Sequence, residues 1–130
     1  MENSDIKNDF ENGLINIADK VVKAEDLVWN NHPAYKGVAL KHLITGKDTS
    51  NKFSCHFVKV EPGCEIGLHI HEGKTELHEI IAGSGFGYIE EKQFVYKPGI
   101  ITLIPADKEH HVKAGENGLF IFAKFFPALV

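Results

Sequence analysis

The chain has 130 residues, of which 43% are hydrophobic, and a formal net charge of −4 at pH 7. This length and composition suit one domain with a buried core. The 14 Lys and Arg residues form no cluster, whereas binding to nucleic acid or to acidic lipid needs a concentrated basic face. We therefore expect neither nucleic acid nor a membrane among the partners.

No segment of the sequence predicts targeting or membrane insertion. Residues 1–5 are polar and acidic, whereas a signal peptide starts with a basic region and an apolar run. No apolar run approaches the roughly 20 residues that a membrane-spanning helix needs. We expect a cytoplasmic protein in which Cys55 and Cys64 are free thiols.

The first quarter of the chain differs in pattern from the rest. We expect residues 1–34 to form an N-terminal arm and residues 35–130 to form the main domain. Residues up to Gly13 are mostly polar without periodicity, which predicts partial disorder. Residues 14–17 predict a short strand, and residues 20–29 predict an extended arm that packs on the domain or on a neighbouring subunit.

Beyond residue 35 the chain predicts many short strands. Apolar runs alternate with glycine, proline and polar turns at regular spacing, which is typical of an all-β sandwich or barrel. The expected strands are residues 37–44, 52–60, 66–71, 76–81, 86–89, 93–96, 100–104, 109–113 and 119–126.

Two features of this region bear on how the strands are connected and covered. Residues 83–85, Gly-Ser-Gly, lack the lysine and helix of a phosphate-binding loop, so we interpret them as a tight turn. Residues 119–126 are apolar on both alternating faces and therefore need cover on each side, from a second sheet or a partner chain. Together with the N-terminal arm, this predicts a homodimer.

The segment around His69 carries the candidate site. His69 and His71 are two residues apart, which on a strand directs both side chains to one face. The polar residues 72–75 include a glycine and predict a hairpin. In that hairpin His71 would face Glu76 and His78 would face His69, so that three imidazoles and a carboxylate would share one face.

Residues 62–83 resemble the first sequence motif of the cupin superfamily. The matching residues of this motif are Gly63, His69, His71, Glu76 and Gly83. The second cupin motif is matched by Gly99, Pro105 and His110, with Asp107 in place of a glycine and Ala114 in place of an asparagine. The resemblance implies a small jelly-roll barrel (a double-stranded β-helix), in which His69, His71, Glu76 and His110 bind one divalent metal ion.

The implied ligand set has a recognisable chemistry. Three imidazoles and one carboxylate suit Fe, Mn, Zn, Ni or Cu better than Ca or Mg. Without a thiolate pattern, a closed structural zinc site is disfavoured. An ion with open positions can act as a Lewis acid or hold a chelating substrate. Motif spacing selects His110 over His111, because only one of them can face inward on a regular strand.

Three further histidines lie on expected strands. His78 is not part of the motif, and we take it as the candidate catalytic residue, since an imidazole beside a bound substrate can move a proton near neutral pH. A further metal ligand and a hydrogen-bonding barrel residue are its alternatives. His42 and His56 are interpreted as hydrogen-bonded core or surface residues.

The resemblance implies a metal-dependent enzyme that acts on a small polar metabolite, by a dioxygenase- or isomerase-type reaction. Two alternatives remain open. One is a binding or sensing module that holds a small molecule without turnover. The other is a metal-free barrel resembling the cupin sugar epimerases, in which histidine and tyrosine act as acid and base. A single fold hosts many chemistries, so the fold does not choose among them.

Overall fold

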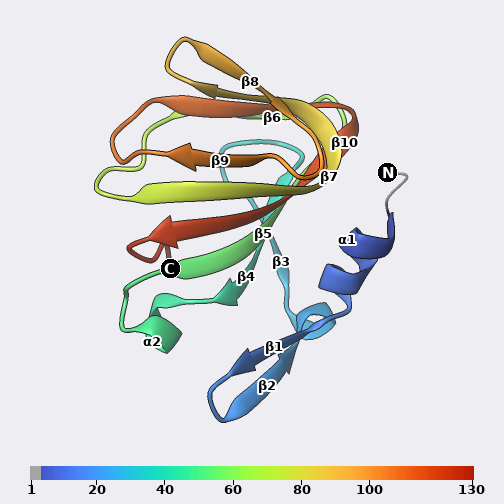
Figure 1. Cartoon of the computed structure of the whole chain (residues 1–130), viewed down its shortest axis with the longest axis vertical. Coiled ribbons are helices and arrows are strands. Elements are labelled where there is room, and N and C mark those ends of the chain that lie inside the picture. The colour runs from blue at the N-terminus through green and yellow to red at the C-terminus, as the bar shows by residue number, and fades with distance from the viewer. Residues whose placement is uncertain (1–3) are drawn as a thin grey trace.

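The computed structural model describes residues 4–130 and is built almost entirely of antiparallel strands (Figure 1). The N-terminal elements are α1 (Ser4–Glu11), β1 (Leu14–Ile17), β2 (Lys20–Lys23) and the 3-10 turn η1 (Ala24–Asp26). The remaining elements are β3 (Trp29–Asn31), β4 (Val38–Ile44), α2 (Gly46–Thr49), β5 (Ser54–Val60), β6 (Glu65–His69), β7 (Thr75–Ile89), β8 (Lys92–Tyr96), β9 (Ile101–Ile104) and β10 (His110–Phe126). In this described part of the chain, no helix is long and apolar enough to cross a bilayer.

Two long strands, β7 and β10, run through both layers of the fold. The first half of β7 pairs with β9 and its second half with β8. The second half of β10 pairs with β5, and its beginning pairs with β6. Each long strand therefore contributes to two sheets that face each other, which is the expected jelly-roll arrangement.

The expected turn at residues 83–85 is wrong, because β7 continues through it. Gly83 has a φ of +89° and lies against Gly118, where the register between β7 and β10 shifts. A Cβ atom on Gly83 would lie 2.1 Å from the carbonyl oxygen of Gly118. Gly83 and Gly118 therefore allow two paired strands to bend together. In the sequence alone, glycines at such a bend look the same as glycines in a turn that ends a strand.

The predicted hairpin between residues 66–71 and 76–81 is also wrong. Strand β6 pairs with β10 and not with β7, so His69 lies opposite His110 instead of His78. The polar connection at residues 72–75 passes from one sheet to the other. A connection between sheets and a hairpin turn share the same polar, glycine-containing composition, which explains the error.

Alternation along β10 separates an inner from an outer face. Leu119, Ile121, Ala123 and Phe125 are buried in the barrel interior, where they join the core of β5 and β7. Phe120 and Phe122 belong to a second apolar cluster on the outer face. The expectation that residues 119–126 need cover on both sides is therefore confirmed.

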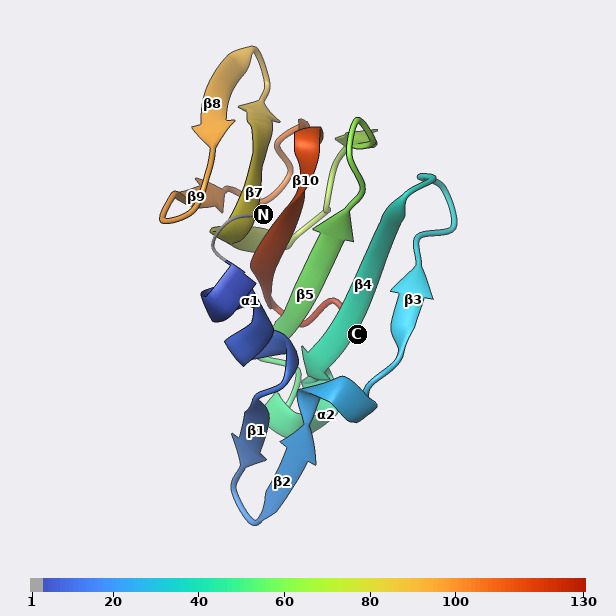
Figure 2. The same ribbon diagram turned by 90° about the vertical axis from the view of Figure 1, so that its right-hand side faces the viewer.

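The cover of the outer face comes from the N-terminal segment of the same chain. Figure 2 shows α1 lying beside β5 and β10, and the ring of Phe10 lies 5.9 Å from Phe57 and 5.8 Å from Phe122. Trp29 packs against Phe120 at 6.2 Å. The N-terminal segment thus packs on the barrel, and the expected disorder is wrong for residues 4–11, which form a helix; residues 1–3 lie outside the described part.

Candidate metal centre

The four candidate donors come from three strands and one loop. His69 ends β6, Glu76 lies near the start of β7, and His110 starts β10, while His71 lies in the loop after β6. The beginnings of β7 and β10 lie on the same side of the barrel, on the left in Figure 1. One potential ligand atom from each residue lies within 4.8 Å of the others, so the group could hold a metal ion.

Backbone carbonyls orient two of the imidazoles. His69 Nδ1 donates to the carbonyl oxygen of Gly67 at 2.6 Å, and His110 Nδ1 donates to that of Lys108 at 2.9 Å. Because Nδ1 carries the proton, Nε2 keeps the lone pair that a metal would accept. Metal-ligating histidines usually have such a partner on the other ring nitrogen.

Two hydrogen bonds fix the loop that carries His71. The Gly73 N–H donates to Asp107 Oδ1 at 2.9 Å, and the Asp107 N–H donates to the carbonyl of His71 at 3.3 Å. Asp107 has a φ of +69°, in the left-handed region that aspartate tolerates better than most residues. Asp107, which replaces a glycine of the second cupin motif, thus preserves the turn and also links it to the loop that carries His71. This contact could not be predicted from local sequence patterns, because it joins residues 34 positions apart.

The centre of the cluster contains buried polar atoms that lack partners. Glu76 Oε1 lies 3.2 Å from His110 Nε2 and 3.6 Å from His71 Nε2. Among the described residues, neither Glu76 Oε1 nor His110 Nε2 has a hydrogen-bond partner of acceptable geometry. Leaving a buried polar atom unsatisfied costs about 1–3 kcal/mol. A cation coordinated by both atoms would remove that cost, so the donor set fits a bound metal ion.

The pKa values of His69, His71 and Glu76 favour neutral imidazoles beside an ionised carboxylate, whereas the pKa of His110 shifts in the opposite direction. Burial lowers the pKa of His69 to about 4, and it also lowers the pKa of His71. Burial alone would raise the pKa of Glu76, but His78 and His110 outweigh it and hold that pKa well below its ordinary value. The contact with Glu76 raises the pKa of His110 against the opposing effect of burial. Neutral imidazole and ionised carboxylate are the forms that bind metals.

His78 lies outside the four-donor group and contacts Glu76. Its Nε2 lies 2.6 Å from Glu76 Oε2, and its Nδ1 lies 2.8 Å from the hydroxyl of Tyr96. His78 and Tyr96 are 2% and 1% exposed. The position of Tyr96 beside His78 was not predicted from the sequence, because it depends on the pairing of β8 with the second half of β7. His111 stacks on Tyr88 instead of joining the cluster.

His42 and His56 form a separate hydrogen-bonded pair. Their Nδ1 atoms lie 2.8 Å apart, and His56 Nε2 lies 2.7 Å from Ser54 Oγ. Ser54 in turn accepts the N–H of Leu129. His56 is fully buried, so the interpretation of these two histidines as hydrogen-bonded residues is confirmed.

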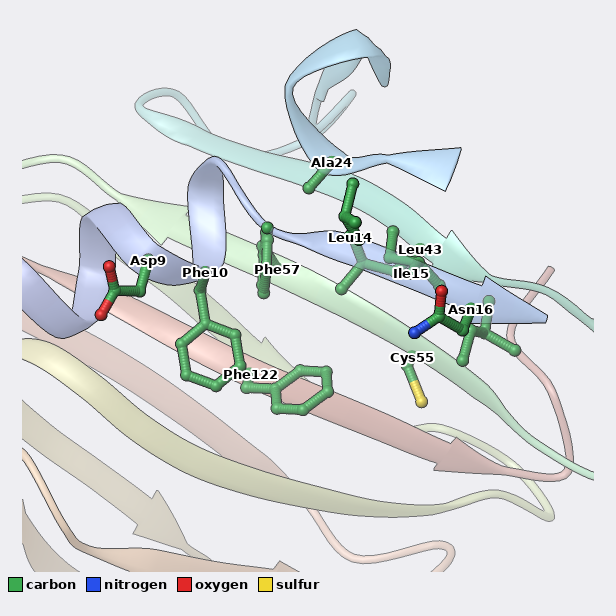
Figure 3. A pocket seen from close by; sticks show the side chains of 12 residues that line it. Asp9, Phe10, Leu14, Ile15, Asn16, Ala24, Leu43, Cys55, Phe57 and Phe122 are labelled. Carbon is green, nitrogen blue, oxygen red and sulfur yellow. The ribbon is translucent and has the colours of Figure 1, made fainter. Parts of the chain in front are cut away.

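An apolar pocket of about 450 Å³ lies between the N-terminal segment and the outer face of the sheet. Phe10, Cys55, Phe57 and Phe122 line it, with Asp9 and Asn16 towards opposite ends (Figure 3). Cys55 is a buried core residue, and burial raises the pKa of its thiol. None of the four candidate metal donors lines this pocket.

Comparisons with known proteins agree with this architecture. The family profile for the cupin domain matches residues 56–122. An oxalate-binding protein from Thermotoga maritima is 29% identical over 81 residues, which are 62% of this chain and 67% of that protein.

Solved structures give the same result. The crystal structure of a predicted oxalate decarboxylase from Thermotoga maritima has 26% identity and a TM-score of 0.75, covering 83% of this chain and 99% of that one. KdgF from Halomonas sp. is 18% identical with a TM-score of 0.70, covering 79% of this chain and 90% of that one, which supports the fold alone. With the jelly-roll topology and the family profile in agreement, this chain belongs to the cupin family.

Proposed function

We propose that this protein is a metal-dependent cupin enzyme in which His69, His71, Glu76 and His110 hold one divalent transition-metal ion. One observation supports this most directly. Four donors converge within 4.8 Å, and two of their buried atoms lack a hydrogen-bond partner among the described residues. When bound, the ion would supply Lewis acidity and open positions for a chelating ligand.

The proposed substrate is a small polar metabolite with at least two oxygen donors, such as a short carboxylic acid. The relatives named for oxalate binding and predicted oxalate decarboxylation support this class. A small acid offers two oxygens to one ion, which a site with four protein donors can accommodate on a six-coordinate metal. A dioxygenase- or isomerase-type reaction on such a substrate is the chemistry that we propose.

Metal titration tests the first part of the proposal. Protein stripped with a chelator is titrated calorimetrically with Fe(II), Mn(II), Zn(II), Ni(II) and Cu(II), anaerobically for iron. We expect one ion per chain for at least one metal, and a loss of affinity of at least about 100-fold in His110→Ala. The control variant His111→Ala should bind as the unaltered protein does, because His111 stacks on Tyr88. No binding, or equal binding in both variants, would refute the metal site.

A second candidate function is ligand binding without turnover. It is favoured by the name of the relative from Thermotoga maritima, an oxalate-binding protein. Metal-loaded protein incubated with oxalate separates the two functions. Consumption of oxalate or uptake of oxygen supports the enzyme, whereas oxalate that binds and is recovered unchanged supports the binding module.

We also propose that the chain forms a homodimer, although not through the outer face of β10, which together with the N-terminal arm first suggested it. The apolar outer face of β10 is covered by the chain's own N-terminal segment. Other apolar side chains are exposed, among them Leu68, Phe94 and Leu103, which line one hollow. Light scattering coupled to gel filtration should give twice the chain mass, and a monomeric mass at working concentration would refute the dimer.

A further inference from the structure

A buried hydrogen-bonded chain lies behind the carboxylate of the candidate metal centre. It runs from Glu76 Oε2 to His78 Nε2 at 2.6 Å, and from His78 Nδ1 to the Tyr96 hydroxyl at 2.8 Å. Glu76 is 6% exposed, and the two residues behind it are still more buried. All three side chains are therefore largely shielded from solvent.

The strands bring these residues together by simple geometry. Glu76 and His78 are two apart on β7, so both face the barrel interior. Tyr96 enters from the end of β8, beside Gly87. A Cβ atom on Gly87 would lie 2.4 Å from the Tyr96 ring, so the absence of a side chain at this position makes room for the tyrosine.

The carboxylate determines the direction of the first hydrogen bond. An ionised carboxylate only accepts, so His78 Nε2 carries a proton and donates it to Glu76 Oε2. The other ring nitrogen, Nδ1, lies 2.8 Å from the Tyr96 hydroxyl, so both nitrogens of the ring have a partner. One oxygen of the glutamate is therefore already engaged. Only Oε1 remains, on the side of His71 and His110.

From this arrangement we propose that His78, held by Tyr96, is a positioning residue that restricts Glu76 to binding the metal through a single oxygen. The inference rests on the proposed metal site. Four protein donor atoms on a six-coordinate ion leave two positions, the number that a substrate with two oxygen donors needs. A glutamate bound through both oxygens would occupy one of these two coordination positions and leave only one for the substrate. With both ring nitrogens engaged inside the barrel, His78 acts through Glu76 and not by moving a substrate proton.

Infrared difference spectroscopy tests the binding mode of the carboxylate. The separation between the asymmetric and symmetric carboxylate stretches is wide for one-oxygen binding and narrow for two-oxygen binding. Spectra of Mn(II)-loaded minus metal-free protein are compared for the unaltered chain, His78→Phe and Tyr96→Phe, with Glu76→Gln used to assign the bands. We expect a wide separation in the unaltered protein and a narrower one in His78→Phe. We also expect Mn(II) affinity to fall about 10–100-fold in both variants.

Tyr96→Phe keeps the aromatic ring and removes only the hydroxyl, so it tests the positioning role even if His78→Phe does not fold. Tyr88→Phe is the matched control, because Tyr88 bonds Gln93 and not the cluster; it should change neither affinity nor band separation. A narrow separation in the unaltered protein, or an unchanged one in the folded His78 or Tyr96 variants, overturns the positioning role alone. Failure of the unaltered protein to bind Mn(II) or any other first-row ion removes the proposed function and this inference together.

Discussion

At the scale of single residues, buried histidines set how the protein responds to acid. His56 is fully buried between Ser54 and His42, and burial lowers its pKa to about 4 from an ordinary 6.5. His42 faces it from β4 and lowers the pKa further, while Glu76 from β7 opposes the shift. Between pH 4 and 6.5 the unfolded chain therefore binds more protons than the folded one, and stability rises with pH.

We predict that acidification from pH 6.5 to 4 reduces the free energy of unfolding, with His56 contributing up to about 3 kcal/mol of that loss. In His56→Gln the dependence on pH over this range should be shallower, as measured by urea unfolding at each pH in metal-free protein. The control His32→Gln removes a half-buried loop histidine whose pKa burial also lowers, though less than that of His56, so it should flatten the slope less than His56→Gln does. Equal slopes in the unaltered protein and His56→Gln would contradict the prediction.

At the scale of elements, the bend shared by β7 and β10 depends on glycine at one position. Both Gly83 and Gly63 have positive φ, +89° and +74°. An added Cβ on Gly83 would overlap the Gly118 carbonyl, whereas at Gly63 no atom of the described residues lies within 4 Å. Backbone strain is thus common to both positions, and steric conflict is specific to Gly83.

We predict that Gly83→Ala lowers the free energy of unfolding by at least about 3 kcal/mol, and that Gly63→Ala lowers it by about 1 kcal/mol. Urea denaturation of the two variants measures the difference. Similar losses of unfolding free energy in the two variants would show that β7 and β10 do not approach each other as closely at Gly83 as described.

The N-terminal helix provides the second prediction at this scale. Phe10 contacts the rings of Phe57 and Phe122, so Phe10→Ala should destabilise the protein by about 2 kcal/mol, the usual range for a partly buried aromatic ring. Val28 lies in the same N-terminal segment but is 72% exposed, and Val28→Ala should cost less than about 0.5 kcal/mol. Thermal unfolding of both variants gives the comparison. Equal melting temperatures would mean that α1 contributes little to the cover of the sheet.

At the scale of the whole molecule, the metal site joins both sheets. His69 and His110 lie at the end of one sheet, and Glu76 lies at the start of the other. An ion bound to all of them would hold the layers together and bind only the folded chain. Ligand binding of this kind stabilises a protein by about 2.7 kcal/mol at a free metal concentration 100 times the Kd.

We therefore predict that saturating metal raises the melting temperature by roughly 10 °C and that a chelator reverses the shift. In His110→Ala the shift should disappear, which differential scanning fluorimetry would detect. A shift that persists in His110→Ala would place the ion elsewhere.

The sequence by itself determined the fold class and the residues that converge. Alternating apolar runs require a two-sided sheet, and the histidine and glutamate spacing that resembles the cupin motifs selected the four side chains that lie within 4.8 Å. The fold class could be predicted from the sequence because the periodicity of a strand depends on residues that are neighbours in the chain.

Only the tertiary structure decided which strands pair and what supports the site. The pairing of His69 with His110, the continuation of β7 through Gly83 and the cover of β10 by α1 depend on contacts between distant residues. The same holds for Tyr96 behind His78 and for Asp107 against Gly73. A turn, a bend and a crossing between sheets use the same residue types, so the choice among them is made by the packing of the whole barrel.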